Sequence, residues 1–308
     1  SQQGKVDPTF NTYDDGLLGD GFDNTVRTLS VQDDGKLIVG GDFLNFNGVA
    51  TPYLCRLLPD GSKDVSFSLG TGFNNKVYAS LLQPDGKILV AGSFTQFNGT
   101  AVGRLVRLNP DGSRDSSFTS SPGATNSIIY DMALQSDGSI FLVGSFTNFN
   151  GTAVNRIVKI LPNGAVDTSF VIGSGASGLI EKIALQSDGK IIIGGGFTSF
   201  NGSSVGKIAR LNTDGTLDTS FITGVGLDDN VSAIGVQADG KIILGGSFTT
   251  YNGNVANKIV RVNTDGTLDA SFASGTGFNS GVVETIKMNS SGAFMLGGSF
   301  SGTYNGLA

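Results

Sequence analysis

Residues 185–202 read Leu-Gln-Ser-Asp-Gly-Lys-Ile-Ile-Ile-Gly-Gly-Gly-Phe-Thr-Ser-Phe-Asn-Gly and set the pattern for the whole chain. Alternating apolar residues lead into the Asp188-Gly189 turn, and an apolar run follows directly after it. An Asp-Gly dipeptide between two such runs is a strong hairpin signal, because both residues tolerate a positive φ. The stretch therefore predicts two antiparallel strands, at residues 182–186 and 190–195.

The same turn recurs at a fixed period, which identifies an internal repeat. Its glycine returns after 51, 52, 51, 51 and 52 residues, at Gly35, Gly86, Gly138, Gly189, Gly240 and Gly292. Three further markers keep this register: a second Asp/Asn-Gly turn, an Asp-x-x-Phe element and a Phe/Tyr-Asn-Gly turn. Chance does not align four markers, so the chain consists of copies of one unit, six of which are visible.

Each copy provides four expected strands. In the copy quoted above, a third strand is expected at residues 207–211, and a short fourth strand ends in Phe221. Four strands in about fifty residues, repeated without helical periodicity, are typical of propeller blades. The sequence predicts an all-β fold, a single β-propeller of about six four-stranded blades that spans residues 1–308.

The two chain ends bear on how the ring closes. Residues 4–10 match residues 215–221, which form the fourth strand of another copy. An N-terminal strand that completes the last blade would close the ring and remove its free edges. The last copy stops at Ala308 before a third strand appears, so a seventh blade stays open as an alternative.

The composition excludes several classes of function. The net charge is −6 and no basic cluster could neutralise a run of phosphates, which argues against a nucleic-acid partner. No apolar stretch approaches the length of a membrane span. With no histidine and one cysteine, Cys55, the chain cannot form a histidine-dependent triad, a zinc site rich in histidine or cysteine, or an intrachain disulfide. We expect no cofactor and no metal.

The motif of residues 185–202 resembles the delta-60 repeat family, and the resemblance covers nearly the whole chain. The resemblance implies a propeller and no catalytic residues. It also implies export, because such repeats occur chiefly in exported bacterial proteins, with the Bacteroidetes prominent. The expected location is the periplasm or cell surface of a diderm bacterium. A start at Ser1 without an initiator methionine is what removal of a signal peptide, or trimming, would leave.

Two recurring polar features are expected to be structural. A basic residue on the third strand and an aspartate eight residues later form a pair inside each blade, at Arg56/Asp64, Arg107/Asp115, Lys159/Asp167, Arg210/Asp218 and Arg261/Asp269. The loop at residues 212–218 resembles a calcium loop, but the first and third copies lack one of its oxygen ligands. Turn chemistry explains all five copies, so we prefer it to a calcium site.

Function is expected where the copies differ. The longest loop between blades, residues 14–23, carries four carboxylates, and Asp228-Asp229 lies in another such loop. First-strand positions vary as well, and Arg27, Tyr78, Tyr130 and Glu181 are expected near the mouth of the central channel. The candidate binding residues are Asp14, Asp15, Asp20, Asp23, Tyr78, Tyr130, Asp228 and Asp229. The alternative is that these charges are only solvated loop residues.

Three classes of function remain. The first is a non-enzymatic, exported propeller that binds a protein partner through its loop-rich face, as a surface adhesin module or an accessory subunit of a Bacteroidetes outer-membrane secretion or gliding machinery. The second is a carbohydrate- or polymer-binding propeller, in which Tyr78 and Tyr130 stack on sugars, although the chain has no tryptophan. The third is a glycosidase or lyase with paired carboxylates, but the spacing of the acidic residues singles out no acid and base.

Overall fold

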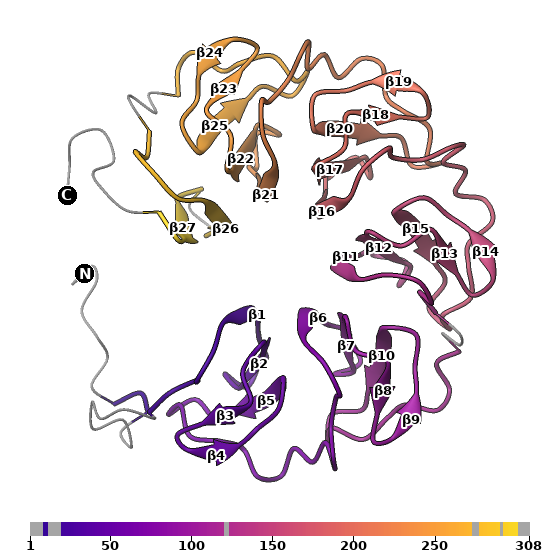
Figure 1. Cartoon of the computed structure of the whole chain (residues 1–308), viewed down its shortest axis with the longest axis vertical. Coiled ribbons are helices and arrows are strands. Elements are labelled where there is room, and N and C mark those ends of the chain that lie inside the picture. Colours follow the sequence, from indigo (N-terminus) through magenta and orange to yellow (C-terminus); the bar gives the residue numbers. More distant parts are fainter. Residues whose placement is uncertain (1–8, 12–19, 120–122, 273–276, 290–291, 301–308) are drawn as a thin grey trace.

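The chain forms six blade-like sheets arranged around a centre (Figure 1). The computed structural model describes residues 9–11, 20–119, 123–272, 277–289 and 292–300, and the regular elements in these ranges are strands. The first strand of each blade is innermost, and the chain proceeds blade by blade around the ring. The prediction of a β-propeller is confirmed.

Each of the first five blades contains a three-stranded antiparallel sheet with the second strand in the middle. The first strands are β1 (Val26–Val31), β6 (Val77–Leu82), β11 (Ile129–Leu134), β16 (Ile180–Leu185), β21 (Val231–Val236) and β26 (Val283–Met288). The second strands are β2 (Leu37–Gly41), β7 (Ile88–Gly92), β12 (Ile140–Gly144), β17 (Ile191–Gly195), β22 (Ile242–Gly246) and β27 (Phe294–Gly298). The third strands are β5 (Leu54–Leu57), β10 (Leu105–Leu108), β15 (Ile157–Ile160), β20 (Ile208–Leu211) and β25 (Ile259–Val262).

A short ribbon joins the second strand to the third and ends in the Phe/Tyr-Asn-Gly turn. The ribbons are β3 (Asn45–Phe46) with β4 (Val49–Ala50), β8 (Gln96–Phe97) with β9 (Thr100–Ala101), β13 (Asn148–Phe149) with β14 (Thr152–Ala153), β18 (Ser199–Phe200) with β19 (Ser203–Ser204), and β23 (Thr250–Tyr251) with β24 (Asn254–Val255). Asn201 and Gly202 have φ values of 47° and 77°, and a type I′ turn requires positive φ at both positions. This is why the dipeptide recurs.

The fourth strand is shorter than the sequence predicts. It is reduced to one isolated bridge per blade, such as Leu211↔Leu217 and Leu57↔Lys63. Beyond the bridge the chain turns, because the next residue, an aspartate, binds the backbone two residues further on. In the fourth blade, Asp218 Oδ1 accepts a hydrogen bond from the Ser220 nitrogen at 3.0 Å. The predicted closure of the ring by a strand at residues 4–10 lies largely outside the described residues.

The core lies between neighbouring blades. Residues of the second strands alternate in direction, so Ile191 and Ile193 face the blade before them while Ile192 packs with the blade after them. The five residues of β17 are all buried. Burial on both faces explains the continuous apolar runs of the second strands, which a half-exposed sheet would not need.

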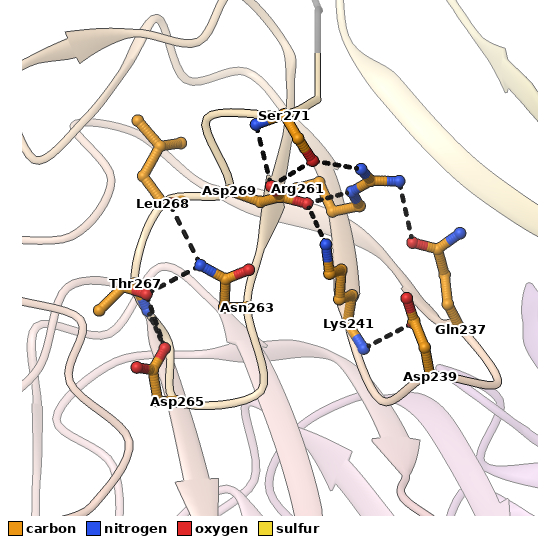
Figure 2. Close-up of polar contacts among 10 residues, drawn as sticks. All are labelled: Gln237, Asp239, Lys241, Arg261, Asn263, Asp265, Thr267, Leu268, Asp269 and Ser271. Carbon is orange, nitrogen blue, oxygen red and sulfur yellow. Dashed lines mark hydrogen bonds and ion pairs between the residues drawn. The ribbon is translucent and has the colours of Figure 1, made fainter.

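A charged clasp stabilises each of the first five blades, and in three of them its arginine also reaches the next blade. Figure 2 shows it in the fifth blade, where Arg261, Lys241 and Ser271 converge on the carboxylate of Asp269. In the second blade, the Nε of Arg107 donates to Asp115 at 2.8 Å and its Nη1 donates to the Pro162 carbonyl of the next blade at 2.7 Å. The predicted structural pairs are confirmed in all five blades: Arg56–Asp64, Arg107–Asp115, Lys159–Asp167, Arg210–Asp218 and Arg261–Asp269.

Candidate functional site: a ring of bulge residues

Every first strand carries a β-bulge at its second residue. The pairing of β1 with β2 shifts between Val26 and Thr28, and the same shift occurs in the other five blades. A bulge leaves one residue unpaired and redirects its side chain. The six bulge residues are Arg27, Tyr78, Tyr130, Glu181, Ser232 and Glu284, and all six line one pocket of about 630 Å³.

Glycine at the end of the second strand makes room for the bulge. A Cβ on Gly92 would lie 2.2 Å from the carbonyl oxygen of Lys76, and one on Gly41 would lie 2.1 Å from that of Thr25. No side chain can occupy such a position without moving the backbone opposite. The repeated glycine therefore maintains the bulge, and the bulge aims Tyr78 and its counterparts at the pocket.

Arg27 is fixed by a buried aspartate, Asp42, that is not among the residues predicted from the sequence. Its Nε and Nη2 donate to the two carboxylate oxygens of Asp42 at 2.5 and 2.7 Å, and the Nζ of Lys76 donates to Asp42 at 2.8 Å. Burial alone would raise the pKa of Asp42, but the hydrogen bonds from Arg27 and Lys76 hold it below its usual value. The guanidinium lies 4.6 Å from the centre of the Tyr78 ring.

Two tyrosines occupy the next part of the wall. The rings of Tyr78 and Tyr130 are 5.3 Å apart at 82°, an edge-to-face arrangement. Burial raises the pKa of Tyr130, and a hydrogen bond with Ser145 opposes that rise. The structure therefore brings together the two predicted aromatic residues, from neighbouring blades.

Glu181 is an acidic residue of the pocket wall. Its carboxylate accepts hydrogen bonds from Ser232 Oγ at 3.0 Å and Asn230 Nδ2 at 3.2 Å. Burial raises its pKa and the neighbouring Asp229 raises it further, while those hydrogen bonds and the nearby Lys182 oppose the change. Glu284 also lines the pocket. Among the described residues no ion pair joins Glu181 or Glu284 to a cation.

Two predicted acidic residues have structural roles. Asp228 Oδ1 accepts the backbone nitrogens of Thr249 and Thr250 at 2.8 and 2.9 Å, and the bonds lower its pKa to about 2 although burial opposes them. Asp23 binds the Leu44 and Asn45 nitrogens in the same way. The equivalent position is an amide or hydroxyl in other blades, with the same partners: Asn74, Asn126 and Ser177.

The other predicted loop residues divide as follows. Asp14 and Asp15 lie outside the described residues. Asp20 is half-buried at the edge of its loop, and Asp229 is exposed and accepts the backbone nitrogen of Asn230 at 2.7 Å. Asp229 is connected to the pocket through its charge, which acts on Glu181.

Cys55 is not part of the site. It is buried and unpaired, and burial raises the pKa of its thiol to about 12. A thiol with that pKa is not a nucleophile at neutral pH. It packs with Val39 and Leu57, as predicted for a small core residue.

The sequence repeats have a known family. The sequence profile described as "Domain of unknown function (DUF5122) beta-propeller" matches residues 32–67, 83–118, 135–170, 186–221 and 237–272, more than half of the chain. The chain belongs to this family. Each DUF5122 repeat runs from the glutamine of the first turn to the phenylalanine after the clasp. All six bulge residues therefore lie outside the matched repeats.

Solved structures share the fold of this DUF5122 propeller at low identity. Virginiamycin B lyase from Staphylococcus aureus is 16% identical with a TM-score of 0.52, over 90% of this chain and 86% of that chain. A gluconolactonase from Xanthomonas campestris is 12% identical with a TM-score of 0.50, over 91% and 84%. A protein of unknown function from Bacteroides caccae is 14% identical with a TM-score of 0.45, over 79% of each chain. No curated protein matches the sequence.

The described part of the chain contains no apolar helix of membrane-spanning length. It also contains no cluster of three or more aspartate, glutamate, cysteine or histidine side chains of the kind that holds a metal. In the loop that resembles a calcium site, Asp214 Oδ1 already accepts hydrogen bonds within the loop. The donors are the backbone nitrogen and the hydroxyl of Thr216, at 3.0 and 2.7 Å.

Proposed function

We propose that this DUF5122 propeller is a non-enzymatic binding module that holds a basic segment of a protein partner in its central pocket. One observation carries the proposal. The repeats keep the clasp, the turns and the core alike, yet the position that each blade directs into the pocket holds Arg, Tyr, Tyr, Glu, Ser and Glu in turn. A side chain that serves only the fold would repeat with the fold.

The charges of the pocket favour a cationic ligand. The two cations that line the pocket already have acidic neighbours. Arg27 shares the carboxylate of Asp42 with Lys76, and Lys182 acts on the half-buried Asp131 and on Glu181. Glu181 and Glu284 form no ion pair among the described residues, and Lys182 and Arg27 act on them only through longer-range charge interactions. A guanidinium or ammonium group between them would find two carboxylates, and the Tyr78 and Tyr130 rings could receive the apolar part of its side chain.

A carbohydrate ligand is the second candidate, and the Tyr78–Tyr130 pair in the pocket wall favours it. An enzyme is less well supported. A variant of virginiamycin B lyase with one histidine replaced by alanine is described as catalytically inactive, and this chain has no histidine. The shared fold therefore does not carry that chemistry over.

Fluorescence anisotropy with labelled, end-capped peptides tests the proposal. We expect an arginine-containing peptide to bind. A matched peptide with glutamate in place of arginine should not bind, and a linear oligosaccharide should not displace the bound peptide. Glu181→Gln and Glu284→Gln should each weaken binding about tenfold, whereas Asp33→Asn, on the turn at the other end of β1, should not. Displacement by the oligosaccharide, with unchanged binding in both glutamine variants, would favour the carbohydrate instead.

We also propose that the chain acts outside the cytoplasm, as an adhesin module or an accessory subunit of an outer-membrane secretion or gliding machinery. The resemblance of residues 185–202 to repeats of exported proteins supports this. Fractionation of the native cells tests it, with the periplasm or cell surface as the expected location and the cytoplasm as the contrary result.

A further inference from the structure

The two ends of the ring expose apolar residues whose counterparts are covered at interfaces between blades. Met295 on β27 occupies the position of Ile192 and Ile243, which pack against the following blade and are fully buried, yet Met295 is 70% exposed. At the other end, Leu29 on β1 occupies the position of Ile183, which faces the preceding blade. Leu29 is 56% exposed and Ile183 only 8%.

The first strands at the two ends of the ring do not pack side by side as the other neighbouring first strands do. Each first strand packs beside the next one, from β1 with β6 through β21 with β26. The series ends there: β26 does not pack on β1 in this way, and Figure 1 separates them by a wider arc than any other pair of neighbours. A ring closed at six blades would bring β26 against β1.

Phe10 and Asn11 already sit where a preceding blade would end. The nitrogen of Asn11 donates to the Asp60 carbonyl at 2.7 Å, as Ser68 donates to Asp111 in the next blade at 2.9 Å. Phe10 thus corresponds to Phe67, whose ring is covered by the Arg56 guanidinium at 4.6 Å and is 6% exposed. Phe10 is 41% exposed.

The clasp is incomplete at the other side of the opening. Arg56, Arg107 and Arg210 each reach a carbonyl on the turn of the next blade. Arg261 instead bonds Gln237 of its own blade at 3.4 Å, and its side chain is 20% exposed against 7–8% for the other three.

We infer that the opening between β27 and β1 is the slot for one further blade of this same repeat. Its polypeptide adds a third strand beside β27, forms a seventh sheet against Leu29, and places a basic third-strand residue over Phe10. The five existing interfaces define this chemistry, because the slot presents the same two faces with their partner removed. The inference is independent of the proposed ligand.

The test is to supply the blade. A second copy of residues 205–267 appended after Ala308 provides a third strand and turn for the sixth blade, then three strands of a seventh, and leaves the segment at Phe10 as its fourth. We expect the melting temperature to rise by about 5 °C or more. Peroxide oxidation of Met295, followed by mass spectrometry, should slow at least about fivefold, while the buried Met132 serves as reference.

Two controls decide the outcome. An appended glycine–serine segment of equal length should change neither quantity, and Arg261→Ala in the appended copy should reduce both gains because Phe10 loses its cation. Unchanged Met295 oxidation in the extended chain would overturn the inference. So would concentration-dependent protection of Met295 in the unextended chain, because a second copy would then fill the slot.

Discussion

Arg27 donates two hydrogen bonds, of 2.5 and 2.7 Å, to the carboxylate of Asp42. Neither residue type occurs at the equivalent positions of the other blades. The slot of Asp42 holds serine or glycine in the other blades: Ser93, Ser145, Gly196, Ser247 and Ser299. Arg27 is one of the six bulge residues around the pocket. Asp42 and Arg27 thus differ from the repeat together, and Asp42 holds Arg27 in its position at the pocket. Substitution of Asp42 can test this pairing.

Asp42→Ser restores the repeat residue and should remove the anchor of Arg27. We expect the free energy of unfolding to fall by about 1–3 kcal/mol, the range for hydrogen bonds to charged groups. Urea titration measures it, with Ser247→Ala at the equivalent position of the fifth blade as the control. Equal stability of Asp42→Ser and the parent would show that the pair does not hold Arg27 in place.

The clasp should be worth far more than a surface ion pair. Arg107→Ala leaves Asp115 buried with Lys87 as its remaining cation and breaks the bond to the Pro162 carbonyl. Removing one partner of a buried pair costs about 3–5 kcal/mol. Arg114→Ala, an exposed arginine in the same blade, should change stability by less than about 0.5 kcal/mol. Similar losses in the two variants would contradict the clasp.

The third blade holds a lysine, Lys159, at the clasp position, and a neighbouring residue explains it. Phe141 lies opposite Lys159 on β12, and its ring packs on Phe170 at 5.1 Å, in the place where other blades stack a guanidinium. Lys159→Arg alone should therefore destabilise the protein through crowding. Phe141→Ile with Lys159→Arg should recover at least the parent stability. A double-mutant cycle without coupling would refute this.

Acid should destabilise the protein through the clasp. Burial acts against ionisation of Asp115 and Asp218, but their serine, lysine and arginine partners hold each pKa well below 3.8. The unfolded chain has a carboxyl pKa of about 3.9, so it binds protons first as the pH falls. The stabilisation is complete above about pH 5 and declines below about pH 4. Urea titrations from pH 6 to 3 should show the decline, reduced in Asp115→Asn. A flat profile would contradict it.

The repeat made the fold predictable, and the limits of the repeat explain what was missed. Turns such as Asp188-Gly189 and Asn201-Gly202 demand particular residues, so they recur visibly and place the strands. Asp23 and Asp228 looked like departures because Asn74 and Ser177 do the same work with other side chains. A carboxylate, an amide or a hydroxyl can each accept the same hydrogen bond. Different residue types can therefore fill one structural role in different blades, and the sequence alone does not show that the role is shared.

The pocket was predictable only in part. Variation at Arg27, Tyr78, Tyr130 and Glu181 pointed to the channel, and the structure places all four there. Asp42 could have been found by the same criterion. Asn230 could not, because its contact with Glu181 depends on the following blade and on Gly196, where a Cβ would lie 3.1 Å from the Asn230 Oδ1. A contact that only one pair of neighbouring blades makes leaves no periodic signal in the sequence.

Binding of a basic segment at the bulge residues is tested most directly by locating the bound ligand with nuclear magnetic resonance. An arginine-containing peptide is titrated into isotopically labelled protein, and backbone amide shifts are followed. We expect the largest shifts at the bulge residues, above all at Glu181, Ser232 and Glu284, with the outer ribbons β8–β9 and β18–β19 unchanged. Saturable shifts confined to the outer ribbons, with the bulge amides unmoved, would contradict it.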